Sequence, residues 1–178
     1  MPREARQPRN SPPSAPAAPD EGVLGKHAGV TYQRERLAPI VRELMPLLEA
    51  DWQENGVDRD KVPLNFDYNR YLDYDLTAIL QIVTARDDGV LVGYVMAFVH
   101  PHIDHAGMGW AILTWYWLFP EYRHGGIGRG MLEAMLGFLR AAQVSVVEAS
   151  EKVASRHGLF GRLGFSPVDT IYRKLLEE

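Results

Sequence analysis

An apolar run, a proline turn, a glycine-rich loop and a helix-forming segment follow one another between Trp115 and Gly130. Gly125, Gly126 and Gly128 let backbone N–H groups approach an anion without obstruction by side chains, and the dipole of the following helix favours negative charge. The segment therefore predicts a strand, a phosphate-binding loop and a helix. It lacks the Lys-Ser/Thr pair of a nucleoside-triphosphate loop and the spacing and acidic residue of a dinucleotide fingerprint.

The composition fits one globular domain and excludes several kinds of site. A chain of 178 residues is long enough for one domain with its own core. It contains no cysteine, which excludes disulfides, thiolate metal sites and a cysteine nucleophile. A net charge of -4 gives no general reason to expect nucleic-acid binding. No apolar run approaches the roughly 20 residues of a membrane span, and no signal-peptide core follows the first arginines, so the expected location is the cytoplasm.

The prolines divide the chain into two regions. Residues 1–27 hold half of the twelve prolines and few large apolar residues, so we expect a disordered Pro/Ala-rich tail there. A partner-docking role for this tail is the alternative. Residues 28–178 are expected to form a single domain.

Hydrophobic periodicity and turn residues predict the elements of that domain. Pro46 falls inside the first expected helix and could kink or split it. The expected order is a strand at 30–34, helices at 37–52 and 67–76, strands at 78–86, 90–99 and 110–118, a helix at 127–139, a strand at 144–149, a short helix at 155–163 and a closing strand at 168–176.

The pattern Arg123-x-x-Gly126-x-Gly128 resembles the pyrophosphate-binding signature of the GCN5-related N-acetyltransferases (GNAT superfamily). The order of elements and Leu163-Gly164-Phe165 also match that family. The resemblance implies an α/β fold with a central mixed, mostly antiparallel sheet, splayed strands and flanking helices. Residues 100–123 further look like acetyltransferases encoded by bacteriophages.

The resemblance implies acetyl-CoA as co-substrate and identifies residues to hold it. Backbone near Leu118 and Phe119 would pair with the pantetheine arm, and Arg123 would touch the phosphates or brace the loop, unless it only pairs with a neighbour such as Glu121. Ile127 and Phe160 are expected at the same site, although Ile127 suits a core anchor better. The amides expected to hold the pyrophosphate are those of His124, Gly125, Gly126, Gly128 and Arg129.

Two proton-handling groups common in the family are missing. The strand before the loop has no glutamate near Thr114, and Phe160 stands where many members have a tyrosine. Other acids, bases and hydroxyl groups take their place as candidate catalytic residues, because histidine and carboxylates transfer protons near neutral pH. These candidates are His102, Asp104, His105, Thr114, Glu148 and His157. The pattern His100-x-His102-x-Asp104 also admits a metal reading, but no second cluster completes a site, and no metal is expected.

These observations favour an acetyl-CoA-dependent N-acetyltransferase that transfers the acetyl group directly to a primary amine in a ternary complex. Two alternatives stay open: a non-catalytic acyl-CoA-binding sensor or scaffold, and a nucleic-acid base-modifying enzyme of the same fold. The acidic charge makes nucleic acid an unlikely partner. The family resemblance also suggests a homodimer. Nothing in the sequence identifies the amine.

Overall fold

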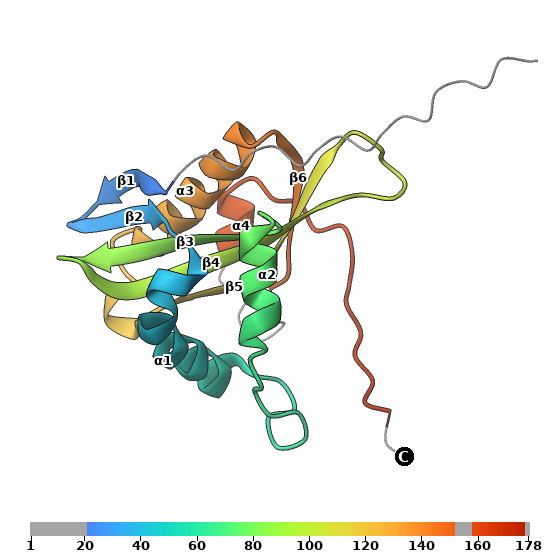
Figure 1. Ribbon diagram of the computed structural model, residues 1–178, viewed down its shortest axis with the longest axis horizontal. Helices are drawn as coiled ribbons and strands as arrows, with labels where there is room; N and C mark the ends of the chain where they lie inside the picture. Colours follow the sequence, from blue (N-terminus) through green and yellow to red (C-terminus); the bar gives the residue numbers. More distant parts are fainter. Residues whose placement is uncertain (1–20, 152–157, 177–178) are drawn as a thin grey trace, which may run out of the picture.

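The computed structural model describes residues 21–151 and 158–176, which form one six-stranded sheet with helices on both faces (Figure 1). The strands lie in chain order, and every neighbouring pair is antiparallel except the parallel pair β5/β6. This confirms the expected α/β class and mixed sheet. The strands are β1 (Gly22–His27), β2 (Val30–Arg34), β3 (Leu80–Asp87), β4 (Val90–Pro101), β5 (Gly109–Leu118) and β6 (Val144–Ala149).

The helices form two layers, one on each face of the sheet (Figure 1). Helices α1 (Leu37–Asn55) and α2 (Tyr68–Leu76) cover one face, and α3 (Ile127–Ala141) and α4 (Leu159–Arg162) cover the other. Each long helix buries one apolar stripe against the strands, as its periodicity predicts. Pro46 is exposed and α1 continues through it without splitting. No helix of the described chain is both long and apolar enough to cross a bilayer.

Strand β5 is paired on both sides only over its first half. A bulge at Thr114 interrupts its ladder with β4, because Met96 faces Trp115 while Ala97 faces Leu113. On the other side the rungs to β6 end at Leu113, opposite Ala149. Beyond this point β5 continues to Leu118 with one open edge. The strands are therefore splayed, as expected.

Two sequence-based expectations about the ends of the domain are wrong. The expected tail reached residue 27, but Gly22–His27 form β1 and pair with β2 across the turn at Ala28 and Gly29. Strand β1 is stabilised by backbone pairing with β2, and its sequence has no alternating apolar pattern that would predict it. Residues 1–20 lie outside the described part of the chain.

The expected closing strand at 168–176 does not form. Its large apolar side chains do not alternate along the segment, and no neighbouring strand pairs with it in the described chain. Figure 1 shows this segment, in red, running away from the sheet. Val168, Ile171, Tyr172 and Leu176 are each at least 80% exposed. In the last expected helix, only Leu159–Arg162 is helical within the described residues.

Candidate functional site

The loop between β5 and α3 presents a group of unbonded backbone amides. Gly125 and Gly126 have φ of 61° and 84°, a left-handed conformation that glycine adopts without strain. Gly126 is the N-cap of the 15-residue helix α3, so the helix dipole adds to the attraction for an anion. Within the described ranges, no acceptor bonds the N–H groups of His124, Gly125, Gly126, Gly128 and Arg129. These five amides fit a pyrophosphate group.

Ile127 belongs to the core rather than to the ligand site. Its side chain is only 3% exposed, and its N–H donates to the His124 carbonyl at 3.3 Å. Its own carbonyl accepts the Tyr32 hydroxyl at 2.9 Å. Ile127 therefore acts as a core anchor, as expected from the sequence, and its role in cofactor binding stays a prediction.

The Arg123 side chain braces the loop against α1. Its two terminal nitrogens donate to the Glu54 carboxylate at 2.6 and 2.5 Å, and its Nε donates to the Leu118 carbonyl at 2.7 Å. The guanidinium carbon also lies 5.5 Å from the centre of a Trp117 ring. The hydrogen bond from Arg123 lowers the pKa of Glu54 below its ordinary value. The partner is thus Glu54 on a distant helix and not the neighbouring Glu121.

Strand β1 supports the same loop through His27. Its Nε2 lies 2.5 Å from the Gly125 carbonyl oxygen. Next to it, Tyr32 of β2 packs so closely on Gly130 that a Cβ there would lie 2.5 Å from the tyrosine oxygen. The β1–β2 hairpin therefore contacts both the loop and the first turn of α3. Sequence reasoning missed His27 because it assigned this residue to the tail.

The open edge of β5 offers backbone groups to an extended ligand. Phe119 donates its N–H to Val92 of β4 at 3.0 Å, so its amide points away from the open edge. In an antiparallel ladder alternate residues point to opposite sides, so the peptide groups of Leu118 and Tyr116 face that edge. One lone pair of the Leu118 carbonyl already accepts from Arg123. Of the predicted backbone pair, Leu118 thus has its peptide group on the open edge, whereas the Phe119 amide is bonded within the sheet; their contact with a pantetheine arm stays a prediction.

Two predicted catalytic residues lie on neighbouring strands near the point where β5 and β6 diverge. Thr114 is exposed in the bulge of β5. Glu148 pairs with Ile112, one rung before the ladder ends. Val147 and Ala149 pack toward α3, so the alternation of strand side chains places Glu148 on the face that carries α1 and α2. Thr114 and Glu148 therefore flank the fork.

The remaining candidate acids and bases lie elsewhere. His102 and His105 cluster beside Trp110 near the tip of the β4–β5 hairpin, with ring centres 4.3 and 5.6 Å from the indole and 4.8 Å from each other. Asp104 donates its backbone N–H to His102 at 3.2 Å. Four residues of strand, or about 13 Å, separate Trp110 from Thr114. His157 lies outside the described residues, and no three potential metal ligands gather among those inside.

Phe160 lies on the other side of the fork, on α4. It is 7% exposed and meets Tyr116 of β5 edge-on, with ring centres 5.4 Å apart. Its ring also contacts that of Phe165 at 5.3 Å. Phe160 therefore forms an apolar wall and supplies no hydroxyl group at this position.

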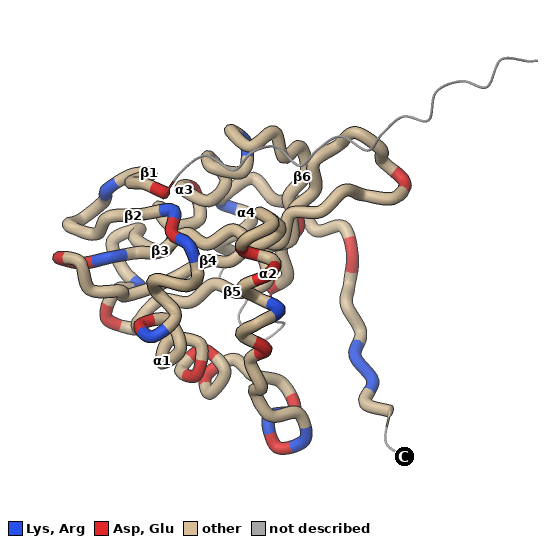
Figure 2. The backbone as a smooth tube through the Cα atoms, viewed as in Figure 1, with Lys and Arg blue, Asp and Glu red and all other residues tan. Residues whose placement is uncertain are grey.

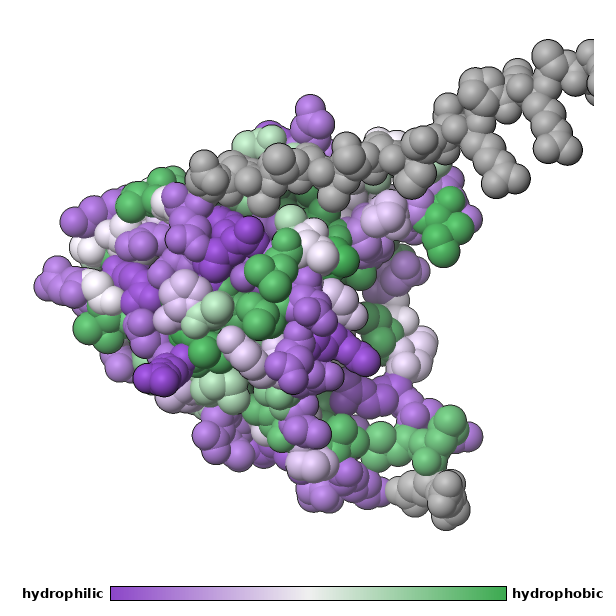
Figure 3. All heavy atoms as spheres, in the orientation of Figure 1, coloured by the Kyte–Doolittle hydropathy of each residue, from purple (hydrophilic) through white to green (hydrophobic). Residues whose placement is uncertain are grey.

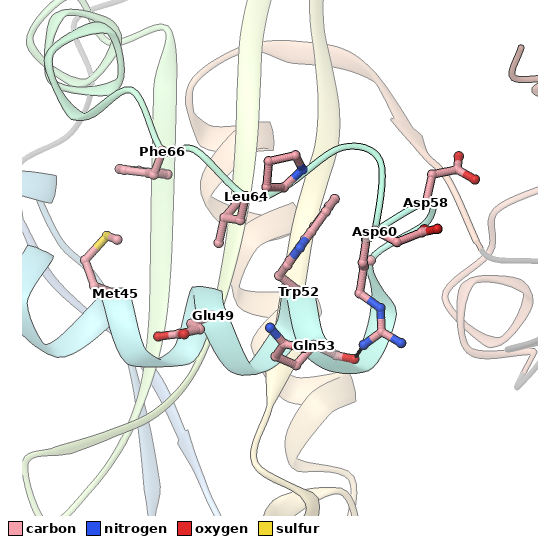
Figure 4. A pocket seen from close by; sticks show the side chains of 11 residues that line it. Met45, Glu49, Trp52, Gln53, Asp58, Asp60, Leu64 and Phe66 are labelled. Carbon is pink, nitrogen blue, oxygen red and sulfur yellow. Dashed lines mark hydrogen bonds between the residues drawn. The ribbon is translucent and has the colours of Figure 1, made fainter. Parts of the chain in front are cut away.

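A groove of about 920 Å³ opens between α1 and the segment that follows it (Figure 4). Its lining is both aromatic and acidic: Trp52 and Phe66 supply rings, and Glu49, Asp58 and Asp60 supply carboxylates. The Arg59 side chain at its edge donates to the backbone of Gln53. Acidic positions outnumber basic ones along α1 (Figure 2). The groove therefore suits a cationic group attached to an apolar or aromatic body.

Comparison with known proteins agrees with this geometry. The model of the Acetyltransferase (GNAT) family matches residues 40–165. No curated protein sequence matches the chain.

Solved acetyltransferase structures share the fold at low sequence identity. An aminoglycoside acetyltransferase from an uncultured soil metagenomic sample, in complex with sisomicin, has a TM-score of 0.65 and 15% identity over 83% of this chain and 97% of its own. The ribosomal-protein-alanine N-acetyltransferase of Brucella melitensis biovar Abortus has a TM-score of 0.60 and 15% identity over 84% and 99%. A predicted acetyltransferase of Clostridium acetobutylicum with acetyl-CoA has a TM-score of 0.63 and 14% identity over 82% and 96%.

Proposed function

The chain belongs to the acetyltransferase (GNAT) family, and from this premise we propose that it transfers the acetyl group of acetyl-CoA directly to a primary amine in a ternary complex. The five unbonded amides at the start of α3 carry the proposal, because they fit a pyrophosphate. The open edge of β5 runs from Thr114 to Leu118, ahead of this loop in the chain, and suits the pantetheine arm. The absence of cysteine favours direct transfer over a cysteine-bound intermediate.

Acetyl transfer to an amine requires a base for the ammonium proton and a positioned thioester carbonyl. Acetyl-CoA, when bound, supplies the activated acetyl group. In this proposal Glu148, next to the point where β5 and β6 separate, takes the proton of the amine. Thr114 in the bulge orients the reacting groups with its hydroxyl.

The acceptor proposed here is a cationic amine with an apolar or aromatic body. The carboxylates of Glu49 and Asp60 attract an ammonium group, and Trp52 lines the same groove, whereas Asp58 already pairs with Arg173 at 3.7 Å. Aminoglycosides and peptides with N-terminal alanine belong in the first acceptor panel, because structural neighbours carry those substrates in their names.

The first experiment is calorimetric titration with acetyl-CoA, CoA and ATP, followed by acetylation assays on the amine panel. We expect micromolar binding of both CoA compounds, no comparable binding of ATP, and acetylated product with at least one amine. Absence of CoA binding would contradict the proposal. Tight binding of acetyl-CoA without product from any amine would favour the alternative, a non-catalytic acyl-CoA sensor, which the missing strand glutamate and Phe160 support.

We further propose that the enzyme is a cytoplasmic homodimer. The segment 166–176 exposes several large apolar side chains, and β6 forms the end of the sheet in the described chain. An exposed strand edge beside an apolar extended segment is a surface that a second copy of the chain can cover.

A further inference from the structure

The C-terminal segment 166–176 reaches the acidic groove through an ion pair. Arg173 Nη1 lies 3.7 Å from Asp58 Oδ2, and Asp58 lines the groove between α1 and the segment that follows it. Figure 1 shows the C-terminal segment leaving α4 and running toward the turn after α1. Within residues 21–151 and 158–176, this is the one ion pair that the C-terminal segment makes.

The turn that carries Asp58 is attached to the end of α1 by hydrogen bonds. The Asp58 carbonyl accepts the N–H groups of Lys61 and Val62 at 2.9 and 2.7 Å. The Arg59 side chain donates to the Gln53 carbonyl of α1. Asp58 is therefore an anion on a well-ordered turn, and the extended C-terminal segment is tied to it.

The C-terminal segment carries the same chemistry as the ligand that the groove suits. Tyr172, Arg173 and Lys174 place two cations beside an aromatic ring, and the groove suits a cationic group on an apolar or aromatic body. Figure 4 shows Asp58 and Asp60 together at one end of the groove. A guanidinium at Asp58 offsets part of the negative charge there and repels an incoming ammonium group.

We propose that the C-terminal segment is an autoinhibitory strap, which competes with the cationic acceptor for the acidic groove through the ion pair of Arg173 with Asp58. The inference rests on the proposed function, in which this groove holds the amine. The side chains of Arg173 and Asp58 are 59% and 35% exposed, so solvent screens the pair and the strap opens readily. An acceptor binds to molecules with an open strap, so its apparent affinity falls in proportion to their share.

Calorimetric titration of the full chain with phenethylamine, an aromatic primary amine, tests the strap. Arg173→Ala should lower the dissociation constant about two- to fivefold, the range that an exposed ion pair supports. Lys174→Ala is the matched control, because it removes an equal charge from the same segment and Lys174 has no ion-pair partner among the described residues. An unchanged dissociation constant for Arg173→Ala would overturn the proposal. Equal tightening by Lys174→Ala would also overturn it, because the effect would then come from charge in general.

The ion pair also predicts how Asp58 contributes to binding. In the wild type Arg173 occupies Asp58, so Asp58→Asn should change the dissociation constant of phenethylamine little. In Arg173→Ala the free carboxylate of Asp58 attracts the ammonium group, so the same substitution should weaken binding about two- to fivefold. Equal effects of Asp58→Asn in the two backgrounds would overturn the strap.

The outcomes separate the strap from the proposed function. CoA binding should be the same in all these variants, because Asp58 and Arg173 lie outside the phosphate-binding loop. Absence of CoA binding would reject the proposed acetyl transfer. Absence of phenethylamine binding in every variant would reject the groove as the acceptor site, and the strap with it. Identical phenethylamine binding by the wild type and all variants would reject the strap alone.

Discussion

Protein groups hold the Arg123 guanidinium on several sides, and this determines how the residue can serve the cofactor. Two bonds run to Glu54 and one to the Leu118 carbonyl, with the Trp117 ring beneath the cation. An arginine held in this way fixes the start of the loop, and we expect it to act on the phosphates only through the loop.

Arg123→Ala should therefore weaken CoA binding by about three- to tenfold, the range expected for a partly exposed ion pair that orders a loop. Glu54→Gln should weaken it in the same direction, and the double variant should be no worse than Arg123→Ala alone. Calorimetric titration with CoA measures all three. Tighter binding of CoA by Glu54→Gln would contradict the role of Arg123 in ordering the loop. It would mean that Arg123, once released from Glu54, reaches the phosphates.

The same pair predicts a pH dependence of the loop. The pKa of Glu54 is lowered in the folded protein, mainly by the hydrogen bond from Arg123. Its contribution to stability is therefore complete above the ordinary carboxyl pKa and is lost as the pH falls through the lower folded value. The melting temperature of Glu54→Gln should accordingly lie below that of the wild type at neutral pH. The two melting temperatures should converge in acid, where Glu54 is protonated.

Two glycines of α3 should respond in opposite ways to the same substitution. A Cβ at Gly130 would lie within 2.5–2.9 Å of the Tyr32 ring and hydroxyl, whereas a Cβ at Gly137 meets nothing within 4 Å. Gly130→Ala should lower the free energy of unfolding by about 1–3 kcal/mol through overpacking. Gly137→Ala should raise it by up to about 1 kcal/mol, because alanine favours the helix. Denaturant unfolding of both variants tests this, and equal stabilities would show that Tyr32 yields freely.

At the scale of elements, the β1–β2 hairpin contacts the phosphate-binding loop, and we expect it to support cofactor binding. His27 connects β1 to the Gly125 carbonyl in the phosphate-binding loop. His27→Ala should raise the dissociation constant for CoA about two- to tenfold, the value of one hydrogen bond. His27→Gln, which keeps an N–H donor, should lose less. Val23→Ala on the same strand is the control, and an equal loss there would assign the effect to the strand in general.

Local patterns explain which elements the sequence predicts. Helical periodicity indicates α1 and α3, and the turn Asp88-Gly89, with φ of 45° and 87°, indicates the β3–β4 hairpin. Strand β1 escapes prediction because pairing with β2, rather than its own side chains, stabilises it. The segment 168–176 is apolar enough for a strand but has no partner strand in the described chain.

In the candidate site, too, the sequence predicts local features, whereas contacts between distant elements escape it. The glycines of the loop predict its free amides, because that property is local. The Arg123–Glu54 pair joins residues 69 positions apart, and the His27–Gly125 contact joins residues 98 apart. Such contacts arise from packing of distant elements, and no short motif contains them. The acidic groove also joins residues of α1 to the segment that follows it.

At the scale of the whole molecule, the C-terminal segment exposes several large apolar side chains to solvent. Apolar side chains lie along it without cover, and Figure 3 shows apolar atoms along this arm of the molecule. Strand β6 leaves one edge unpaired at the end of the described sheet. A second copy would bury both features together, which is why we expect a homodimer.

Sedimentation over a range of concentrations tests the expected dimer. Placing two carboxylates on the segment with Ile171→Asp and Tyr172→Asp should shift the equilibrium toward monomer, because burying unpaired charges at an interface is costly. Ile103→Asp is the matched control: Ile103 is 96% exposed at the tip of the β4–β5 hairpin, far along the chain from the segment. If Ile103→Asp dissociates the dimer equally, the interface involves the hairpin instead. A wild-type chain that sediments as a monomer at every concentration would show that the apolar segment serves a different partner.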